Sequence, residues 1–328
     1  MRILVMGAGA VGSAIGGYLS RNHEVLLVGR GAHMDAMADH GLAIDGILGS
    51  SQHTPLVCKE GALKDHPFLQ KPLDWVLITV KSPATRIATE ELIQAIPDPE
   101  RPVWAHIQNG MGNLETIRET LTSGGITQLP IILSGMTITG YDIPDPGHVR
   151  ITVYGGPGKI GWLETNDSQS NSVYPEAARS LVDILSETPL VFEYSDRMIS
   201  FLWAKLLYNC CLNPLGALLK LPYGELRVEP ALELMKEILD EAFALAALEK
   251  APLFWASAQD YFDHLQQTLI PATAEHEPSM LADIQKGRAT EIMAMNGFIV
   301  ERSESHGLKA PVNSTIVQLI RSAHMKNG

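Results

Sequence analysis

The fold of this chain is decided near its start, by the stretch Arg2-Ile3-Leu4-Val5-Met6-Gly7-Ala8-Gly9-Ala10-Val11-Gly12. Its opening residues form an apolar run that is typical of a buried strand, and residues 7–12 then match G-x-G-x-x-G. A helical segment rich in Ala and Gly follows over residues 10–19, and a second apolar run follows over residues 23–28. Strand, glycine turn, helix and second strand in this order predict a Rossmann-type, dinucleotide-binding α/β domain.

Each glycine of this motif has a separate physical role in holding a pyrophosphate. Gly7 permits the tight turn, Gly9 lets the backbone approach the phosphates, and Gly12 lets the helix pack closely on the strand. The free amide groups and the positive end of the helix then face the phosphates. We therefore predict a cofactor site at Gly7, Ala8, Gly9, Ala10, Val11 and Gly12, against the alternative of an ordinary glycine turn.

The end of the second predicted strand indicates which dinucleotide binds. NAD sites usually place Asp or Glu there to hold the ribose 2′-hydroxyl, whereas this chain has Val28-Gly29-Arg30-Gly31. The Arg30 guanidinium offers a bidentate donor to a 2′-phosphate, and no carboxylate is present to repel it. The sequence favours NADPH, with a solvated surface arginine as the alternative. Lys81 ends a later predicted strand, where it is a second candidate contact to the cofactor or merely solvated.

The alternation of strands and helices continues to about residue 195. Apolar runs typical of a parallel sheet covered on both faces recur at residues 75–80, 103–107, 131–138 and 190–194. Helices are predicted to begin near Ser82-Pro83, Asn113 and Pro175. Two runs of alternating polarity predict an antiparallel addition to the sheet at residues 148–153 and 159–162.

Beyond residue 195 the pattern changes to long segments with a helical period. These segments lie at residues 196–219, 231–248, 255–269, 279–304 and 312–322. We therefore predict an NADP-binding Rossmann domain over residues 1–195 and an all-α substrate and catalytic domain over residues 196–328.

Composition disfavours several classes of protein. The 328 residues carry 25 basic and 37 acidic side chains, a net charge of −12, whereas a nucleic-acid binder needs a broad basic face. No run approaches the ~18 apolar residues of a membrane span, and the start does not resemble a secretory leader, so we expect a cytoplasmic protein without a membrane partner. The three cysteines lack CxxC spacing, so we expect reduced thiols and no metal site. The apolar helical domain is compatible with a homodimer and does not require one.

A stripe of polar side chains lies on an otherwise apolar predicted helix. Lys205, Asn209 and Asn213 are spaced four apart, so at about 100° per residue they form one narrow row. A lysine and two amides that line an internal cavity suit an anionic, oxygen-rich ligand; the alternative is that neighbouring backbone groups satisfy the asparagines. Further along, Ser279 reads as a helix cap with Asp283 in the first turn, and the spacing of Arg288 and Glu291 suits a surface ion pair.

Together these features resemble the ketopantoate reductases (2-dehydropantoate 2-reductases), which pair a Rossmann domain with a helical domain in the 6-phosphogluconate-dehydrogenase-like architecture. The resemblance extends over nearly the whole chain. Besides the glycine motif and Arg30, the matching segments are Thr79-Val80-Lys81, Gln108-Asn109-Gly110-Met111-Gly112, Lys205-Leu206-Leu207-Tyr208-Asn209-Cys210-Cys211-Leu212-Asn213-Pro214, Pro278-Ser279-Met280 with Asp283, Gly287-Arg288-Ala289-Thr290-Glu291-Ile292, Asn296-Gly297, and His306-Gly307 with Pro311.

The resemblance implies roles for individual residues. Lys205 would be the catalytic general acid, and Asn109 would touch both the nicotinamide and the substrate. Lys81 would help to hold the cofactor, and Glu291 would lie by the cofactor ribose and the substrate instead of on the surface. The remaining substrate contacts would come from Asn209, Asn213 and Ser279.

The activity implied by the resemblance is the NADPH-dependent reduction of 2-dehydropantoate to (R)-pantoate, in pantothenate and coenzyme A biosynthesis. Two departures from the family pattern leave its substrate open. Tyr223 precedes Gly224-Glu225-Leu226 where the family often has asparagine, and the stretch over residues 250–275 is longer than expected. A related NADP-dependent reductase of another 2-keto acid is one alternative. A non-catalytic NADP(H)-binding sensor is another, although a sensor has no need of the polar stripe.

Overall fold

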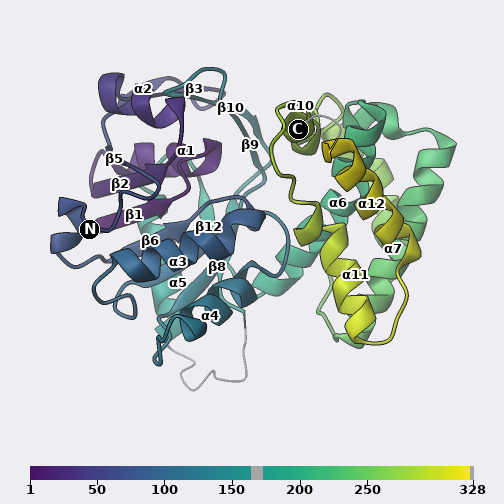
Figure 1. The fold of residues 1–328 in the computed structure, drawn as a ribbon. Helices are drawn as coiled ribbons and strands as arrows, with labels where there is room; N and C mark the ends of the chain where they lie inside the picture. The colour runs from purple at the N-terminus through teal and green to yellow at the C-terminus, as the bar shows by residue number, and fades with distance from the viewer. Residues whose placement is uncertain (164–172, 326–328) are drawn as a thin grey trace. The chain divides into compact units, whose positions relative to one another are not determined.

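The chain forms two compact units in a computed structural model, which describes residues 1–163 and 173–325 (Figure 1). Unit 1 comprises Met1–Gln108 and Asn113–Met198, and unit 2 comprises Asn109–Gly112 and Ile199–Gly328. The short segment Asn109–Gly112 belongs to unit 2 because the Met111 backbone N–H donates to the Ala294 carbonyl at 2.8 Å.

Among the described residues, unit 1 is built on an eight-stranded sheet. The strands lie in the order β5 (Leu56–Lys59), β2 (Glu24–Gly29), β1 (Arg2–Met6), β6 (Trp75–Ile78), β7 (Val103–Ile107), β8 (Ile132–Met136), β11 (Gly158–Gly161) and β12 (Phe192–Tyr194). The strands from β5 to β8 pair in parallel, whereas β11 pairs antiparallel to β8. This order, with β1 in the interior of the sheet, confirms the predicted Rossmann-type domain.

Helices cover both faces of this sheet, which explains why its strands are apolar throughout. Ile3 and Val5 of β1 pack into the same core as helices α1 (Ala10–Leu19), α2 (Ala32–His40) and α5 (Val173–Leu185). Leu4 and Met6 face the opposite side, with α3 (Thr85–Ala95) and α4 (Asn113–Ser123), which lie side by side (Figure 1). Burial on both faces is the usual condition of a parallel sheet.

A second sheet of unit 1 shows that one sequence prediction was wrong. Residues 159–162 correspond to β11, which is the predicted antiparallel addition. Residues 148–153 instead belong to a separate sheet, in the order β4 (Ser51–His53), β3 (Leu42–Gly46), β10 (His148–Tyr154) and β9 (Thr139–Asp142). Strand β10 pairs in parallel with β3, far away in sequence, and a Cβ at Gly46 would lie 2.0 Å from the Ile151 carbonyl oxygen. Local polarity cannot identify so distant a partner.

The predicted helix starts in unit 1 agree with the structure with one adjustment. Helix α4 begins at Asn113 with Glu115 in its first turn, as expected. The chain at Ser82-Pro83 first forms a 3₁₀ turn, η2 (Ser82–Ala84), and the α-helix α3 begins only at Thr85. A proline in the first turn suits either geometry because its missing N–H has no partner there.

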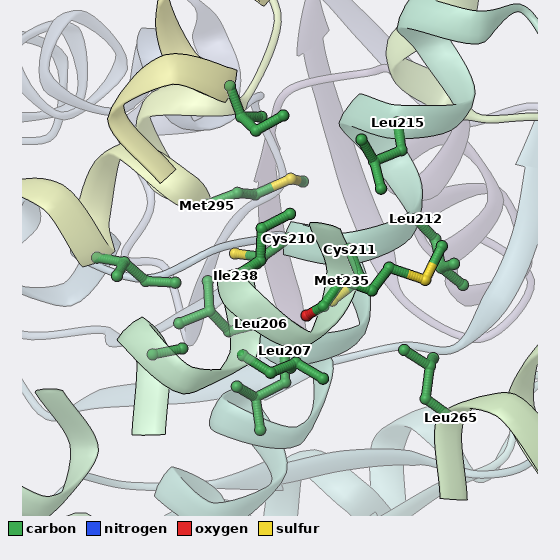
Figure 2. Close-up of a cluster of buried hydrophobic side chains, with 14 of the residues drawn as sticks. Leu206, Leu207, Cys210, Cys211, Leu212, Leu215, Met235, Ile238, Leu265 and Met295 are labelled. Atoms are coloured by element: carbon green, nitrogen blue, oxygen red, sulfur yellow. The ribbon is translucent and has the colours of Figure 1, made fainter. Parts of the chain in front are cut away.

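Unit 2 is helical, as predicted. Its core surrounds helix α6 (Met198–Leu219), which packs against α7 (Glu229–Leu248). Figure 2 shows the α6 side chains of Leu206, Leu207, Cys210 and Cys211 in this core with Met235 and Ile238 of α7. Both cysteines of α6 are fully buried free thiols, and burial raises the pKa of the Cys211 thiol, so it remains protonated.

The predicted helix over residues 279–304 is broken in the structure. Its parts are α10 (Ser279–Gln285), a 3₁₀ turn η5 (Ile292–Ala294) and α11 (Asn296–Ser305), and α12 (Pro311–Met325) follows. The break begins at Gly287, whose φ of 62° is left-handed, and the Arg288 Nε donates to the Asp283 carboxylate at 3.1 Å. The predicted helix over residues 255–269 is present as one continuous helical segment, made up of α8 (Ala258–His264), a π-helical turn η4 (Leu265–Leu269) and α9 (Ile270–Ala272).

No helix within residues 1–163 and 173–325 combines the length and the apolarity that crossing a bilayer requires.

Candidate functional site

The glycine loop of unit 1 has the backbone geometry that the motif predicts. Gly7 has φ 113°, and a Cβ added to it would lie 2.4 Å from the Val80 backbone nitrogen. A Cβ added to Gly12 would lie 2.2 Å from the Gly7 carbonyl oxygen, which also accepts a hydrogen bond from the Thr79 hydroxyl at 2.8 Å. Neither position can carry a side chain without moving the backbone, so both glycines are structural.

Gly9 differs from the other two glycines because it faces open space. It precedes the first residue of α1 with φ −82° and ψ −167°, and no described heavy atom lies within 4 Å of a Cβ added there. Gly9 is exposed, Ala10 and Val11 are half-buried, and the Ala8 N–H is held by the Val28 carbonyl at 2.8 Å. The loop therefore leaves a cradle at the positive end of α1 that a side chain would fill and that suits a pyrophosphate.

Arg30 and Lys81 lie at the same edge of the sheet as this loop. Strands β2 and β6 flank β1, and Arg30 and Lys81 follow the carboxyl ends of these two strands. Both residues are exposed, and the Arg30 side chain makes no hydrogen bond or ion pair with any residue that the structure describes. The carboxyl edge of an open parallel sheet is where ligands bind, so both cations are placed where they could hold a phosphate.

Replacing Gly9 with alanine should separate cofactor binding from folding. Its backbone angles suit alanine, so we expect the midpoint of thermal unfolding to stay within about 2 °C of the native value. The added methyl group would occupy the cradle and weaken NADPH binding by about tenfold or more, as measured by fluorescence titration. Gly7→Ala is the matched control, and its clash with Val80 should lower the unfolding midpoint. Unchanged NADPH affinity in Gly9→Ala would argue against a cofactor at this loop.

The polar stripe on α6 lies inside unit 2. Asn209 and Asn213 are only 5% and 4% exposed, and Lys205 is half-buried. The Asn213 Nδ2 donates to Asn209 Oδ1 at 3.2 Å, so the two amides are directly linked. A helix face this deeply buried is not a solvated one. We therefore interpret the stripe as side chains that line a polar site.

Lys205 has the electrostatic surroundings of a proton donor. Burial lowers the pKa of its ammonium group to about 8, and attraction to the Glu291 carboxylate opposes this decrease. Glu291 is itself only 8% exposed, and Asn109 Nδ2 donates to its Oε2 at 3.3 Å. A lysine whose pKa lies near neutrality is suited to acid–base chemistry.

Two hydroxyl groups contact the Asn213 side of the asparagine pair, and an unpaired amide donor lies on the Asn209 side. The Tyr223 hydroxyl donates to Asn213 Oδ1 at 3.0 Å, and the Ser279 hydroxyl reaches the same oxygen at 3.5 Å. At the other end, Asn209 Nδ2 is buried and has no hydrogen-bond partner in the described part of the chain. A buried unpaired donor costs free energy, so this atom is a position where a ligand oxygen could be bound.

The structure differs from two interpretations of local spacing in the last segment of the site. Arg288 does not pair with Glu291; its NH2 atom lies 3.0 Å from the Asp283 carboxylate, and Glu291 is buried against Asn109. Ser279 is not the helix cap, because Pro278 occupies that position and Ser279 is the first helical residue. Tyr223 is the contact that sequence reasoning missed. The sequence shows Tyr223 where the family often has asparagine, but it does not show that the Tyr223 hydroxyl contacts Asn213.

No group of three or more His, Cys, Asp or Glu side chains in residues 1–163 and 173–325 is arranged to hold a metal ion.

Known proteins resemble this chain along its whole length. The family model described as "Ketopantoate reductase PanE/ApbA" matches residues 3–164, and the one described as "Ketopantoate reductase PanE/ApbA C terminal" matches residues 197–324. A 2-dehydropantoate 2-reductase of Aquifex aeolicus is 33% identical over 329 residues, covering 100% of this chain and 98% of the relative. One of Pyrococcus horikoshii is 32% identical over 340 residues, covering 100% and 99%.

Solved structures agree with these matches. A PanE/ApbA family ketopantoate reductase from Ralstonia eutropha superposes with a TM-score of 0.81 at 28% identity, covering 100% of this chain and 99% of the other. A D-mandelate dehydrogenase, solved with NADH and anilino(oxo)acetate, shares the fold with a TM-score of 0.83 at 24% identity and the same coverage. The glycine loop, the buried lysine–asparagine helix and these full-length matches lead to one conclusion: the chain belongs to the ketopantoate reductase family.

Proposed function

We propose that this protein reduces 2-dehydropantoate to (R)-pantoate with NADPH, as a cytoplasmic step of pantothenate and coenzyme A biosynthesis. The observation that carries the proposal is the presence on α6 of a half-buried lysine, whose pKa is lowered to about 8, together with the unpaired Asn209 Nδ2. The names of the full-length relatives support the choice of substrate. The cradle at Gly9 supports a dinucleotide, and the exposed Arg30 supports one with a 2′-phosphate.

The proposed mechanism assigns proton donation to unit 2. Bound NADPH would supply the hydride that the ketone carbon accepts. Lys205 would hold its ammonium group against the ketone oxygen, stabilise the negative charge that develops there, and give that oxygen a proton. Asn209 would donate its free Nδ2–H to a substrate oxygen, with Asn213 and Ser279 as further polar contacts. Glu291 would keep Lys205 protonated and orient Asn109. The product would be an alcohol.

A reductase of a different 2-keto acid is the second candidate. Tyr223 contacts the substrate asparagines directly, and a neighbour in fold is a D-mandelate dehydrogenase, so the same architecture accommodates other 2-hydroxy acids. Specificity constants for a panel that contains ketopantoate, benzoylformate and 2-ketoisovalerate would separate the two. Ketopantoate should have the largest kcat/KM. A higher kcat/KM for another member of the panel would identify that 2-keto acid as the better substrate.

The direct test is a steady-state assay of NADPH absorbance with ketopantoate, repeated with NADH. We expect turnover with both components present and a marked preference for NADPH. Binding of NADPH without turnover of any 2-keto acid would favour a sensor and contradict the proposal.

The pH dependence of reduction should report the Lys205 pKa. Only the protonated lysine can donate, so kcat/KM should be level below about pH 7 and fall as the pH rises through about 8. The Glu291 charge raises this pKa, and Glu291→Gln should therefore move the inflection to lower pH. Glu301→Gln removes an exposed carboxylate of the same unit and should leave the inflection in place. The assignment fails if Glu291→Gln has the native inflection.

A further inference from the structure

Tyr223 is packed against residues at the end of the 250–275 stretch and just beyond it. It begins the 3₁₀ turn η3 (Tyr223–Leu226) and is only 2% exposed. Its N–H donates to the His276 carbonyl at 3.1 Å, and its ring lies 5.2 Å from the His276 ring and 5.8 Å from that of Tyr208. The next N–H, of Gly224, donates to the Ala274 carbonyl at 2.9 Å. The phenol ring is thus packed by residues on both sides.

The hydroxyl of Tyr223 determines which end of the Asn213 amide faces it. Burial raises the pKa of Tyr223 well above its usual range, so the group remains a hydrogen-bond donor throughout the working pH range. A donor in this position favours the Asn213 oxygen, at 3.0 Å, and turns the Asn213 Nδ2 toward Asn209 Oδ1, at 3.2 Å. The Asn209 Nδ2 is then the atom left unpaired.

Without this donor, the orientation of both amides is weakly determined. The Ser279 hydroxyl reaches the Asn213 oxygen only at 3.5 Å, the limit of a hydrogen bond, and Ser279 is exposed. A reversed Asn213 would present its oxygen to Asn209, which would reverse in turn and leave an acceptor where the donor now lies. An acceptor in that position would repel a carboxylate or ketone oxygen.

We propose that Tyr223 is a positioning residue for the substrate, acting through an amide relay of Tyr223, Asn213 and Asn209 that keeps the Asn209 Nδ2–H free to bind an anionic 2-keto acid. The identity of the ligand that this relay would bind rests on the proposed function. Residues at and just beyond the end of the 250–275 stretch hold the tyrosine in place.

The relay is tested by removing one hydroxyl with Tyr223→Phe. We expect KM for ketopantoate to rise about tenfold, with kcat changed less than threefold and NADPH affinity unchanged, because a contact made equally in the ground and transition states is lost. Loss of packing alone would lower the unfolding midpoint and the active fraction and would leave KM unchanged. An unchanged KM would overturn the relay.

Two further variants show whether the effect passes through Asn209. Tyr208→Phe is the matched control: it removes a neighbouring phenol hydroxyl that donates to Thr273 at 2.9 Å, and KM should stay within about twofold of native. In an Asn209→Ala background, Tyr223→Phe should raise KM by less than about twofold, because the end of the relay is already missing. A full additional effect in that background, or an equal rise in Tyr208→Phe, would overturn the proposal.

Calorimetric titration of ketopantoate into the protein separates this relay from the proposed reaction. Ketopantoate that binds without turnover, and binds more weakly to Tyr223→Phe, would refute the reduction and retain the relay. Turnover in the native protein with equal affinity in Tyr223→Phe would retain the reduction and refute the relay. No binding and no turnover would refute both.

Discussion

Lys205→Ala is expected to lower kcat for 2-keto acid reduction by about 10³-fold while NADPH binding is retained. The variant loses both the charge that stabilises the ketone oxygen and the proton that this oxygen receives, and each effect is large in a poorly solvated site. NADPH affinity should be largely retained because the glycine loop and Arg30, which would hold the cofactor phosphates, belong to unit 1, whereas Lys205 belongs to unit 2. Single-turnover absorbance and a fluorescence titration of NADPH measure the two quantities.

Two companion variants make this result specific. Lys205→Arg keeps the positive charge, but its guanidinium has too high a pKa to release a proton, so binding should survive better than turnover. Lys309→Ala removes an exposed lysine of the same unit and should leave kcat within about twofold of native. A Lys205→Ala enzyme that turns over at close to the native rate would remove Lys205 from the role of general acid.

Arg30→Ala is expected to lower kcat/KM for NADPH by about 30- to 100-fold and to leave the value for NADH nearly unchanged. A charge-assisted, bidentate contact to the 2′-phosphate accounts for a loss of this size, and NADH has no phosphate there to lose. The preference for NADPH over NADH should therefore fall because kcat/KM falls with NADPH and not with NADH. Steady-state kinetics with both cofactors at saturating ketopantoate measure it.

The control for this variant is Arg101→Ala, which removes another exposed arginine of unit 1 and should leave both values unchanged. Equal losses with NADPH and NADH in Arg30→Ala would show that Arg30 contacts a part that the two cofactors share. A native enzyme that prefers NADH would contradict the 2′-phosphate argument itself.

Features that depend on neighbours in sequence were predictable. The glycine loop is one, because its turn, its helix start and the close approach of Gly12 to Gly7 all arise within a few residues. The row of Lys205, Asn209 and Asn213 is another, because helical periodicity alone aligns them. A cationic side chain beside two amides, suited to an anionic ligand, could therefore be anticipated from α6 by itself.

Features that depend on distant partners were not predictable from local patterns. The pairing of β10 with β3 is one, because the two strands lie about 100 residues apart in the sequence. Glu291 reads as half of a helix-surface ion pair until Asn109, from a distant loop, is brought against it. In the sequence, Tyr223 is only a departure from the asparagine that the family often has, and its hydrogen bond to Asn213 appears only in the folded structure.

The sequence by itself determined the Rossmann-type unit, the helical unit and the residue types available for hydride and proton transfer, because strand and helix periods and glycine conformations are local properties of the chain. Only the tertiary structure decided the pKa of Lys205, the burial of Glu291 and the unpaired state of the Asn209 Nδ2. Desolvation and hydrogen-bond partnership depend on which segments pack together, and packing is a property of the whole fold.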